Sequence, residues 1–186
     1  DVVRSICPPG VHLIFTRQYS PKGLGDAVLC AKPVIGDSPF AVILPDDLVD
    51  SPSSCIGELI AKREEKGGGN VVAVQNVPRE KTNLYGIASV KADAPESVTG
   101  LVEKPKPEEA PSTLAVIGRY VFENVTPGAG GEIQLTDAME ASLESVPMTA
   151  CRFSGRRFDC GSKQGFITAT VHYAKKAGFD TSGDAE

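Results

Sequence analysis

Apolar residues in the first part of the chain recur with two different periods, which predicts a strand followed by a helix. Apolar and polar positions alternate over residues 11–16, the pattern of a strand with one buried face. A glycine-containing break follows, and residues 26–32 then have the pattern of a helix that Pro33 ends. We therefore expect the fold to begin with a β-α unit.

A second β-α-β unit is predicted over residues 40–75. Residues 40–44 are a continuous apolar run, which is typical of a parallel strand buried on both faces. Apolar side chains at helical spacing follow over residues 56–63, and the glycines at 67–69 end that helix. Residues 71–75 have the pattern of the next strand. The two units together give a β-α-β-α-β order.

The second half of the chain departs from this alternation. Residues 86–90 and 98–102 have strand patterns with no helix between them, which predicts an antiparallel hairpin. The remaining elements are a strand at 113–121, a helix marked by Leu135, Met139, Leu143 and Val146, a strand at 149–153 and a final helix at 166–177. The predicted fold class is α/β, with a mostly parallel sheet flanked by helices and a small antiparallel insertion.

The composition indicates a globular protein and excludes several classes. The chain has 186 residues, of which 41% are hydrophobic, enough for one domain over residues 1–186. No apolar stretch approaches the roughly 20 residues that cross a bilayer, so a membrane-spanning protein is excluded. A net charge of −5 offers no general attraction for polyphosphates or anionic membranes. We expect neither nucleic acid nor a membrane as a partner.

Cysteine and histidine usage restricts the chemistry further. Five cysteines without a CxxC pair fit neither a zinc site nor a closed disulfide framework, which favours a reducing, cytoplasmic location. With only two histidines, a catalytic apparatus based on histidine has little material. The start at Asp1 shows no basic stretch followed by an apolar segment, so we expect no signal peptide and a fragment of a longer protein.

Two acidic residues directly follow the predicted strand at 40–44. Ligands of parallel sheets bind outside the carboxyl ends of the strands, which is where Asp46 and Asp47 are expected. A hard cation such as Mg²⁺ prefers one or two carboxylates together with substrate oxygens. The alternative is that one of the two acids only caps the next turn, as Asp after Pro often does. The pattern favours a ligand role for Asp46 more than for Asp47.

Four other segments carry candidate chemistry, each with a structural alternative. Residues 22–25, Lys-Gly-Leu-Gly, allow backbone amides to approach a ligand closely, although an ordinary tight turn is more common. Residues 103–104, Glu-Lys, present an acceptor for sugar hydroxyls beside a cation for phosphate, or are a solvated pair. Residues 128–132 form a phosphate nest or a flexible approach to a helix. Asp159 supplies a second carboxylate or caps the last helix.

These segments together resemble one known family. The chain is similar to the bacterial UTP–glucose-1-phosphate uridylyltransferases, also called UDP-glucose pyrophosphorylases, from about residue 6 to about residue 177. The longer motifs are highly specific. In order, they are Arg-Gln at 17–18, Lys-Gly-Leu-Gly at 22–25, Leu-Pro-Asp-Asp at 44–47, Val-Glu-Lys-Pro at 102–105, Gly-Ala-Gly-Gly-Glu-Ile-Gln-Leu-Thr-Asp at 128–137 and Asp-Cys-Gly at 159–161.

The resemblance implies a Rossmann-like nucleotidyltransferase fold in which Mg²⁺, UTP and glucose 1-phosphate meet above the sheet. Gln18 and Gly25 match residues that contact the uracil. Asp46 matches the metal-binding aspartate, and Asp159 resembles the second metal carboxylate of the wider superfamily. The family also implies a homo-oligomer.

The remaining matches concern the sugar and the phosphates. Gly86 and Glu103 match the sugar contacts, and Lys104 matches the lysine at the phosphates. In this reaction the sugar phosphate attacks the α-phosphorus of UTP in line and needs no general base, because its oxygen is already ionised near neutral pH. Lys104 and Asp46 with its Mg²⁺ are then the implied catalytic residues, since they neutralise the charge of the transferring and leaving oxygens.

The chain departs from the family's pattern in two places. The family opens with a strand and an Ala-Gly-x-Gly-Thr-Arg type of loop that grips the triphosphate, and it usually inserts a helix between the positions of Tyr120 and Pro127. Without the opening strand we expect an exposed sheet edge and apolar surface. The alternatives to a uridylyltransferase are a non-catalytic module that binds nucleotide sugars and a sister enzyme that uses dTTP.

Overall fold

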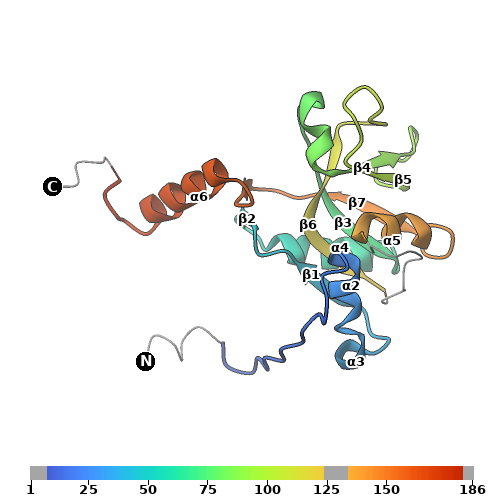
Figure 1. The fold of residues 1–186 in the computed structure, drawn as a ribbon, viewed down its shortest axis with the longest axis horizontal. Helices are drawn as coiled ribbons and strands as arrows, with labels where there is room; N and C mark the ends of the chain where they lie inside the picture. Colours follow the sequence, from blue (N-terminus) through green and yellow to red (C-terminus); the bar gives the residue numbers. More distant parts are fainter. Residues whose placement is uncertain (1–7, 124–133, 182–186) are drawn as a thin grey trace.

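A six-stranded sheet with helices on both faces forms the main body of the protein (Figure 1). The computed structural model describes residues 8–123 and 134–181. The strand order is β5-β4-β6-β3-β7, and β1 also pairs with β6. The strands are β1 (Phe40–Ile43), β3 (Asn70–Asn76), β4 (Gly86–Val90), β5 (Val98–Glu103), β6 (Leu114–Phe122) and β7 (Met148–Arg152).

Strand directions confirm the α/β class but show more antiparallel pairing than expected. Within the described residues, β1, β3, β4 and β7 run in one direction, whereas β5 and β6 run in the other. Only β3 and β7 form a parallel ladder there, because β6 lies between β3 on one side and β1 and β4 on the other. The predicted β4–β5 hairpin is present, and it extends the main sheet through the pairing of Ile87 with Ala115.

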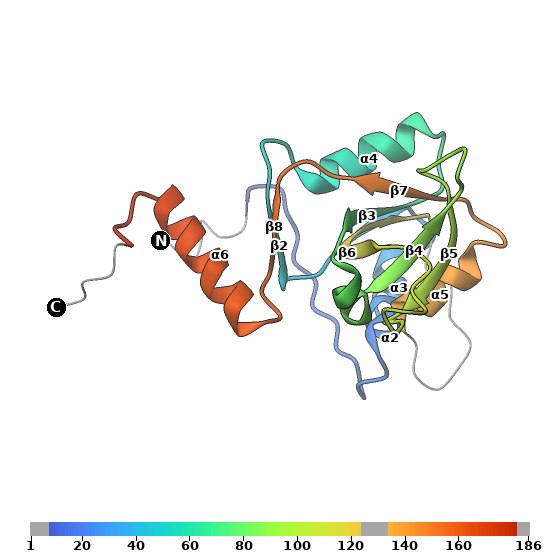
Figure 2. The same cartoon turned by 90° about the horizontal axis from the view of Figure 1, so that it is seen from above.

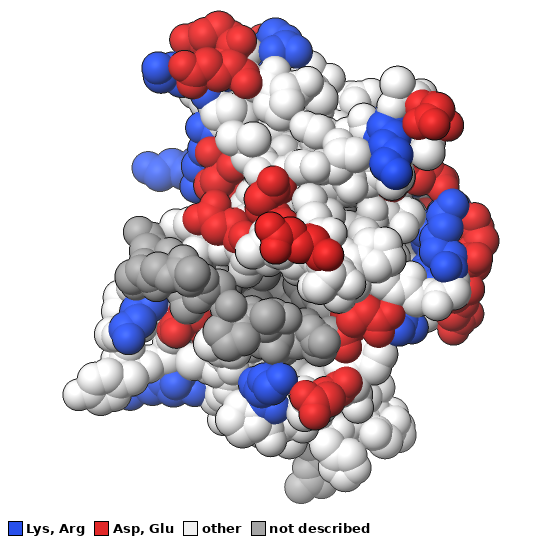
Figure 3. Space-filling model, turned by 90° about the vertical axis from the view of Figure 1, so that its right-hand side faces the viewer, with Lys and Arg blue, Asp and Glu red and all other residues white. Residues whose placement is uncertain are grey.

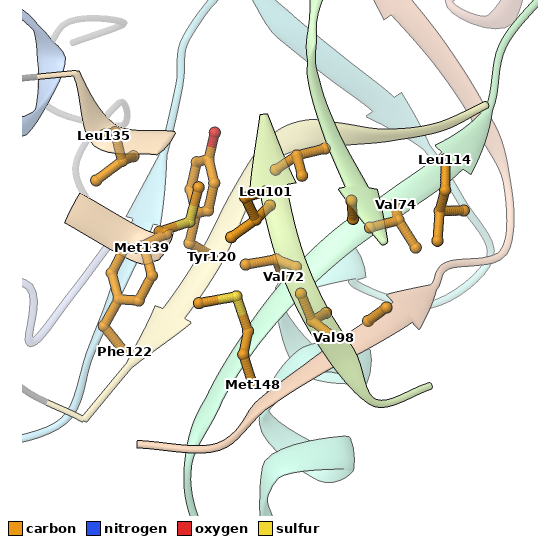
Figure 4. Close-up of a cluster of buried hydrophobic side chains, with 13 residues drawn as sticks. Val72, Val74, Val98, Leu101, Leu114, Tyr120, Phe122, Leu135, Met139 and Met148 are labelled. Atoms are coloured by element: carbon orange, nitrogen blue, oxygen red, sulfur yellow. The ribbon is translucent and has the colours of Figure 1, made fainter. Parts of the chain in front are cut away.

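Alternation along the central strands divides the core between two faces of the sheet. Val72 and Val74 of β3 pack on one face with Tyr120 and Phe122 of β6. Figure 4 shows this cluster, to which Leu135 and Met139 of α5 contribute. On the other face β3 and β6 bury Val71, Ala73, Ala115, Ile117 and Val121 against α4.

Helices cover both faces because each carries one apolar stripe. On one side α4 (Cys55–Glu65) buries Leu59 completely, and Ser54 caps its first turn by accepting the N–H of Gly57 at 3.2 Å. On the other side lie α2 (Leu24–Leu29) and α5 (Leu135–Ser142). The short α3 (Lys32–Ile35) and the 3₁₀ helix η1 (Arg79–Leu84) lie in the connections. Truncating Leu59 to alanine would cost about 2–5 kcal/mol.

A two-stranded ribbon links the sheet to the last helix. It pairs β2 (Asp47–Asp50) with β8 (Arg156–Asp159), and α6 (Lys163–Lys176) packs against it (Figure 2). Side chains alternate across a strand, so one face of the ribbon carries Asp47, Arg157 and Asp159. The other face carries Asp50 and Phe158 toward α6, whose His172 places Nε2 at 2.6 Å from Asp50 Oδ2.

An ion-pair cluster holds α6 on this ribbon. Lys176 donates to the second oxygen of Asp50, and the His172 ring lies 4.7 Å from that of Phe158. The hydrogen bonds from Lys176 and then from His172 lower the pKa of Asp50. At the other end of α6, a Cβ on Gly165 would collide with the carbonyl oxygen of Asp159, so the start of the helix lies directly against the end of β8.

Two predictions near the beginning of the chain are wrong. Residues 11–16 form no strand, because they pair with no strand of the described sheet; Leu13 and Phe15 are 64% and 89% exposed. The predicted helix at 26–32 begins and ends earlier, as α2. Pro33 does not end a helix but lies in the first turn of α3, where its missing N–H costs nothing.

The strand at residues 40–44 also differs from the prediction. β1 is antiparallel to β6, and its side chains alternate between half-buried and exposed rather than being buried on both faces. In the described part of the chain its outer edge pairs with no other strand, so the expected exposed sheet edge is present, with Ile43 exposed. α5 is shorter than predicted, since its C-cap is Leu143 and Val146 lies beyond it.

Candidate active site

A cavity of about 260 Å³ opens where β1, β4, β5, the ribbon and the start of α5 meet. It contains five of the residues predicted from the sequence: Asp46, Gly86, Glu103, Lys104 and Asp159. They come from segments more than 100 residues apart in the chain. The other lining residues are Leu24, Leu44, Asp47, Leu84, Tyr85, Val116, Gly118, Tyr120, Gln134, Leu135, Thr136 and Arg157.

Asp46 and Asp159 direct their carboxylates toward the same small space. The N–H of Cys160 donates to the carbonyl of Asp46 at 2.7 Å, which joins the two segments. A Cβ built on Gly161 would lie 3.2 Å from Asp159 Oδ1 and 3.5 Å from Asp46 Oδ2. Two carboxylates facing one another beside a cavity are suitable ligands for a hard divalent cation.

The remaining ligands of such a cation would have to come from elsewhere. In residues 8–123 and 134–181 no three His, Cys, Asp or Glu side chains are grouped as a metal site. Mg²⁺ is usually bound by one or two carboxylates and completes its shell with substrate oxygens and water. Asp46 and Asp159 therefore fit a cation that is shared with a phosphate ligand.

Asp47 has a structural role rather than a ligand role. Its buried carboxylate accepts the N–H of Gly118 at 2.9 Å and Nε of Arg157 at 2.5 Å. A Cβ on Gly118 would lie only 2.8 Å from Asp47 Oδ2, so the absence of a side chain there permits this approach. Burial alone would lower the pKa of Arg157, but the hydrogen bonds to Asp47 and Tyr85 outweigh it and the pKa is raised.

Arg157 and Tyr85 together orient Asp159. Arg157 Nη2 lies 3.3 Å from Asp159 Oδ2, and its Nη1 donates to the Tyr85 hydroxyl at 3.3 Å. The guanidinium also stacks 5.1 Å above the Tyr85 ring, whose hydroxyl donates to Asp159 Oδ2 at 3.1 Å. Because all three guanidinium nitrogens have protein partners, Arg157 supports the site rather than binding a ligand. Sequence reasoning missed it, although alternation along β8 places it on the same face as Asp159.

Glu103 lies opposite Gly86 in the β4–β5 ladder. Its Oε2 accepts a hydrogen bond of 2.5 Å from the hydroxyl of Thr136, which is buried in the first turn of α5. A Cβ on Gly86 would lie 2.9 Å from that hydroxyl and 3.3 Å from Glu103 Oε2. The glycine is therefore needed for the Glu103–Thr136 pair to form. Thr136 lies in the 128–137 motif, but the sequence analysis assigned it no role.

Lys104 has an unusual backbone conformation. Its φ is +43°, the only positive φ of a non-glycine residue in the described ranges. Such a conformation costs of order 1 kcal/mol or more and is found preferentially at functional sites. The N–H of Lys104 donates to the carbonyl of Tyr85 at 3.0 Å, and its Nζ, on a side chain that is 60% exposed, lies 3.5 Å from Glu103 Oε1. An acceptor and a cation are thus presented side by side to the cavity.

Gln18 and Gly25 lie beside the cavity rather than in its lining. Nε2 of Gln18 donates to Asp26 Oδ2 at 2.6 Å and to the carbonyl of Gly23 at 3.0 Å, which fixes the loop before α2. Gly25 is buried and lines a smaller, mainly apolar pocket of about 40 Å³ between α2 and α5. Their assignment to the uracil stays a prediction. Residues 128–132, the glycine-rich segment, lie outside the described residues.

The charged side chains on the face shown in Figure 3 are mixed. Acidic groups lie near its centre and basic groups are scattered around them, so the visible described residues form no continuous basic surface there. None of the described helices is long and apolar enough to cross a membrane.

Comparisons with known proteins agree with the motifs. The profile of the family described as Nucleotidyl transferase matches residues 5–176. A UTP–glucose-1-phosphate uridylyltransferase of Komagataeibacter xylinus is 52% identical over 147 residues, covering 74% of this chain and 51% of that protein.

Two solved structures are similar to the present one. A UDP-glucose pyrophosphorylase complexed with UDP-glucose has a TM-score of 0.76 at 37% identity, covering 86% of this chain and 65% of that one. A UTP-bound UGPase from Acinetobacter baumannii has a TM-score of 0.81 at 38% identity, covering 94% of this chain and 64% of that one. The chain thus spans about half to two thirds of the length of these proteins.

Proposed function

The chain belongs to the nucleotidyl transferase family, and on this basis we propose that it transfers the uridylyl group of UTP to glucose 1-phosphate. The products are UDP-glucose and pyrophosphate. The observation that carries the proposal is the convergence of Asp46, Gly86, Glu103, Lys104 and Asp159 on one cavity. The relatives named as UTP–glucose-1-phosphate uridylyltransferases support this reaction over the alternative of a non-catalytic module.

The proposed reaction needs alignment and charge neutralisation more than proton transfer. A phosphate oxygen of glucose 1-phosphate forms a bond to the α-phosphorus of UTP, and the bond between that phosphorus and the bridging oxygen breaks. The electron pair leaves with pyrophosphate. The attacking oxygen is already ionised, so a chain with two histidines is not at a disadvantage. Lys104 would place its ammonium against the phosphates, where it offsets the charge of the reacting oxygens.

Asp46 and Asp159 would hold Mg²⁺. When bound, this ion would neutralise phosphate charge and fix the orientation of the phosphate oxygens. The support is the pair of carboxylates that converge at Gly161. Arg157 and Tyr85 would keep Asp159 in the orientation that such a ligand needs, because Arg157 forms an ion pair with its Oδ2 and the Tyr85 hydroxyl donates to the same oxygen.

The other substrate contacts follow the same pattern. Glu103 would accept hydrogen bonds from sugar hydroxyls, with the backbone at Gly86 close enough for the sugar to lie against it. Gln18 and Gly25, beside α2, would contact the uracil. We place the protein in the cytoplasm as a homo-oligomer. The four cysteines that the structure describes are free thiols, which supports a reducing compartment.

Pyrophosphate release by the purified protein with Mg²⁺, UTP and glucose 1-phosphate tests the proposal. Asp46→Asn and Lys104→Met should each reduce turnover by at least about 100-fold, because each removes charge stabilisation of the transition state. The matched controls Asp93→Asn and Lys91→Met change exposed residues outside the cavity and should keep full turnover.

Three other outcomes would contradict the proposal. Turnover that is unchanged in Asp46→Asn and Lys104→Met would refute their roles. Protection against thermal unfolding by UDP-glucose without pyrophosphate release would identify a binding module. Preference for dTTP over UTP would identify a sister nucleotidyltransferase.

A further inference from the structure

The carboxylate of Glu103 is restrained from two sides, by Gly86 and by Thr136. Below it, Gly86 leaves the space that a Cβ would fill. Beside it, the Thr136 hydroxyl donates to Oε2 at 2.5 Å. Thr136 is 7% exposed and Glu103 is half-buried, so this hydrogen bond is shielded from water. It is stronger than a neutral one because its acceptor is ionised.

A second hydrogen bond also joins α5 to β5. One helical turn further along α5, a carboxylate oxygen of Glu140 accepts the N–H of Leu101 at 2.5 Å. Four residues of a helix advance about 6 Å, and the two strand residues from Leu101 to Glu103 advance about 6.6 Å. The spacing of the two contacts is therefore the same on the helix and on the strand. Thr136 pairs with Glu103 and Glu140 with Leu101, so α5 runs antiparallel to β5.

Lys104 competes with Thr136 for the same carboxylate. Its Nζ lies 3.5 Å from Glu103 Oε1, and its side chain is largely exposed. If Oε2 lost its donor, the carboxylate would be free to rotate toward the ammonium. That rotation would make both Glu103 and Lys104 less available to the substrate. Paired with Lys104, the carboxylate would present fewer lone pairs to a sugar hydroxyl. The paired ammonium would in turn offer less charge to a phosphate.

On the basis of the proposed function, we propose that Thr136 is a positioning residue that keeps Glu103 turned toward the sugar and away from Lys104. It acts through Glu103 and touches no reacting atom. Its loss should therefore weaken recognition of the sugar while leaving recognition of the nucleotide unchanged. Discrimination between glucose 1-phosphate and its epimers should also fall, because a carboxylate that rotates freely accepts hydroxyls in more than one arrangement.

Calorimetric titration of the whole protein with UDP-glucose and with UDP tests this inference. Thr136→Val keeps the shape but removes the donor, and it should weaken UDP-glucose binding about tenfold or more relative to UDP. Thr136→Ser keeps the donor and should stay within about threefold of the wild type. In turnover assays Thr136→Val should raise the KM for glucose 1-phosphate, leave that for UTP unchanged, and accept galactose 1-phosphate or mannose 1-phosphate relatively better.

Glu140→Gln is the matched control. It weakens the other contact between α5 and β5 and lies outside the cavity lining, so it should lower the unfolding temperature without changing the ratio of the two affinities. An equal loss in Glu140→Gln, or in Thr136→Ser, would overturn the inference by showing a general loosening of α5. If Thr136→Val does not fold, Thr136→Ala is the second variant, with the same expected ratio.

The outcomes separate this inference from the proposed function. A wild-type protein that binds UDP-glucose no better than UDP would contradict the function itself, and with it the role of Thr136. A wild-type preference that persists in Thr136→Val would refute Thr136 as a positioning residue while leaving the function standing.

Discussion

Replacing Arg157 by methionine removes the counter-charge of Asp47 while keeping a long apolar side chain. The two side chains are 9% and 10% exposed, and their contact is 2.5 Å. In the variant the Asp47 carboxylate would retain the N–H of Gly118 and lose its charged partner. Asp159 would keep its bonds from the Tyr85 hydroxyl and from the N–H of Gly161.

Burial decides the size of the effect. Breaking a buried ion pair by removing one partner costs about 3–5 kcal/mol, because a charge stays in a poorly solvated place, whereas an exposed pair contributes about 0–1 kcal/mol. We expect the Arg157→Met variant to lose about 3 kcal/mol or more. For a chain of this size the loss corresponds to a fall of roughly 6–20 °C in Tm.

Urea unfolding followed by circular dichroism measures the loss. Arg156→Met is the matched control, because Arg156 is the neighbour on the opposite face of β8. Its exposed guanidinium lies 4.7 Å over the Phe158 ring. Replacing it should cost less than about 1 kcal/mol. Adding Asp47→Asn to Arg157→Met removes the unpaired charge and should recover part of the stability. A loss below about 1 kcal/mol in Arg157→Met would show that the pair is effectively solvated, and the reasoning from burial would be refuted.

Three further predictions use the same structure. Gly86→Ala should abolish the stabilisation by UDP-glucose in thermal unfolding, since its Cβ would lie 2.9 Å from the Thr136 hydroxyl. In the control Gly100→Ala the new Cβ would meet nothing closer than 3.8 Å, so the stabilisation by UDP-glucose should be retained. Retained stabilisation in both variants would contradict the steric argument. The pKa of Asp50 is lowered below 3.8 by Lys176 and His172, so its contribution to stability is present above pH 3.8 and disappears as the pH falls through the lower folded value. The stabilities of the wild type and Asp50→Asn should therefore converge as the pH falls in acid unfolding experiments. A stability difference that stays constant with pH would count against this role of Asp50. Burial raises the pKa of Cys55 to about 11, so a thiol reagent at pH 8 should label Cys160 and not Cys55; mass mapping that finds Cys55 labelled first would oppose this order.

Local patterns predicted most of the central fold correctly. α4, β3, the β4–β5 hairpin, β6, β7 and α6 lie where their periodicity and flanking glycines indicated. In these segments the apolar stripe is long enough for the period to be unambiguous. The failures are of a different kind: residues 11–16 alternate like a strand, but a strand needs a partner to pair with, and a local pattern does not supply one.

The site was predicted in part for the same reason. Asp46, Glu103 and Lys104 lie in motifs that the family resemblance identified, and the structure brings them to one cavity. Thr136 and Arg157 were missed because their importance depends on what they touch. A threonine in a first helical turn and an arginine in a short strand are ordinary until the fold places them against Glu103 and Asp159.

The sequence by itself determined the family and the order of the main elements, and it indicated the residues that we propose for phosphate and sugar recognition, because these properties belong to short segments and to their order along the chain. The sequence favoured Asp46 over Asp47 as the ligand, and only the tertiary structure showed the physical reason. Asp46 faces the cavity, whereas the Asp47 carboxylate accepts the N–H of Gly118 and pairs with Arg157. The two are neighbours with the same side chain. They differ because alternation along the start of β2 turns one toward the interior, where a buried charge requires a partner, and leaves the other exposed.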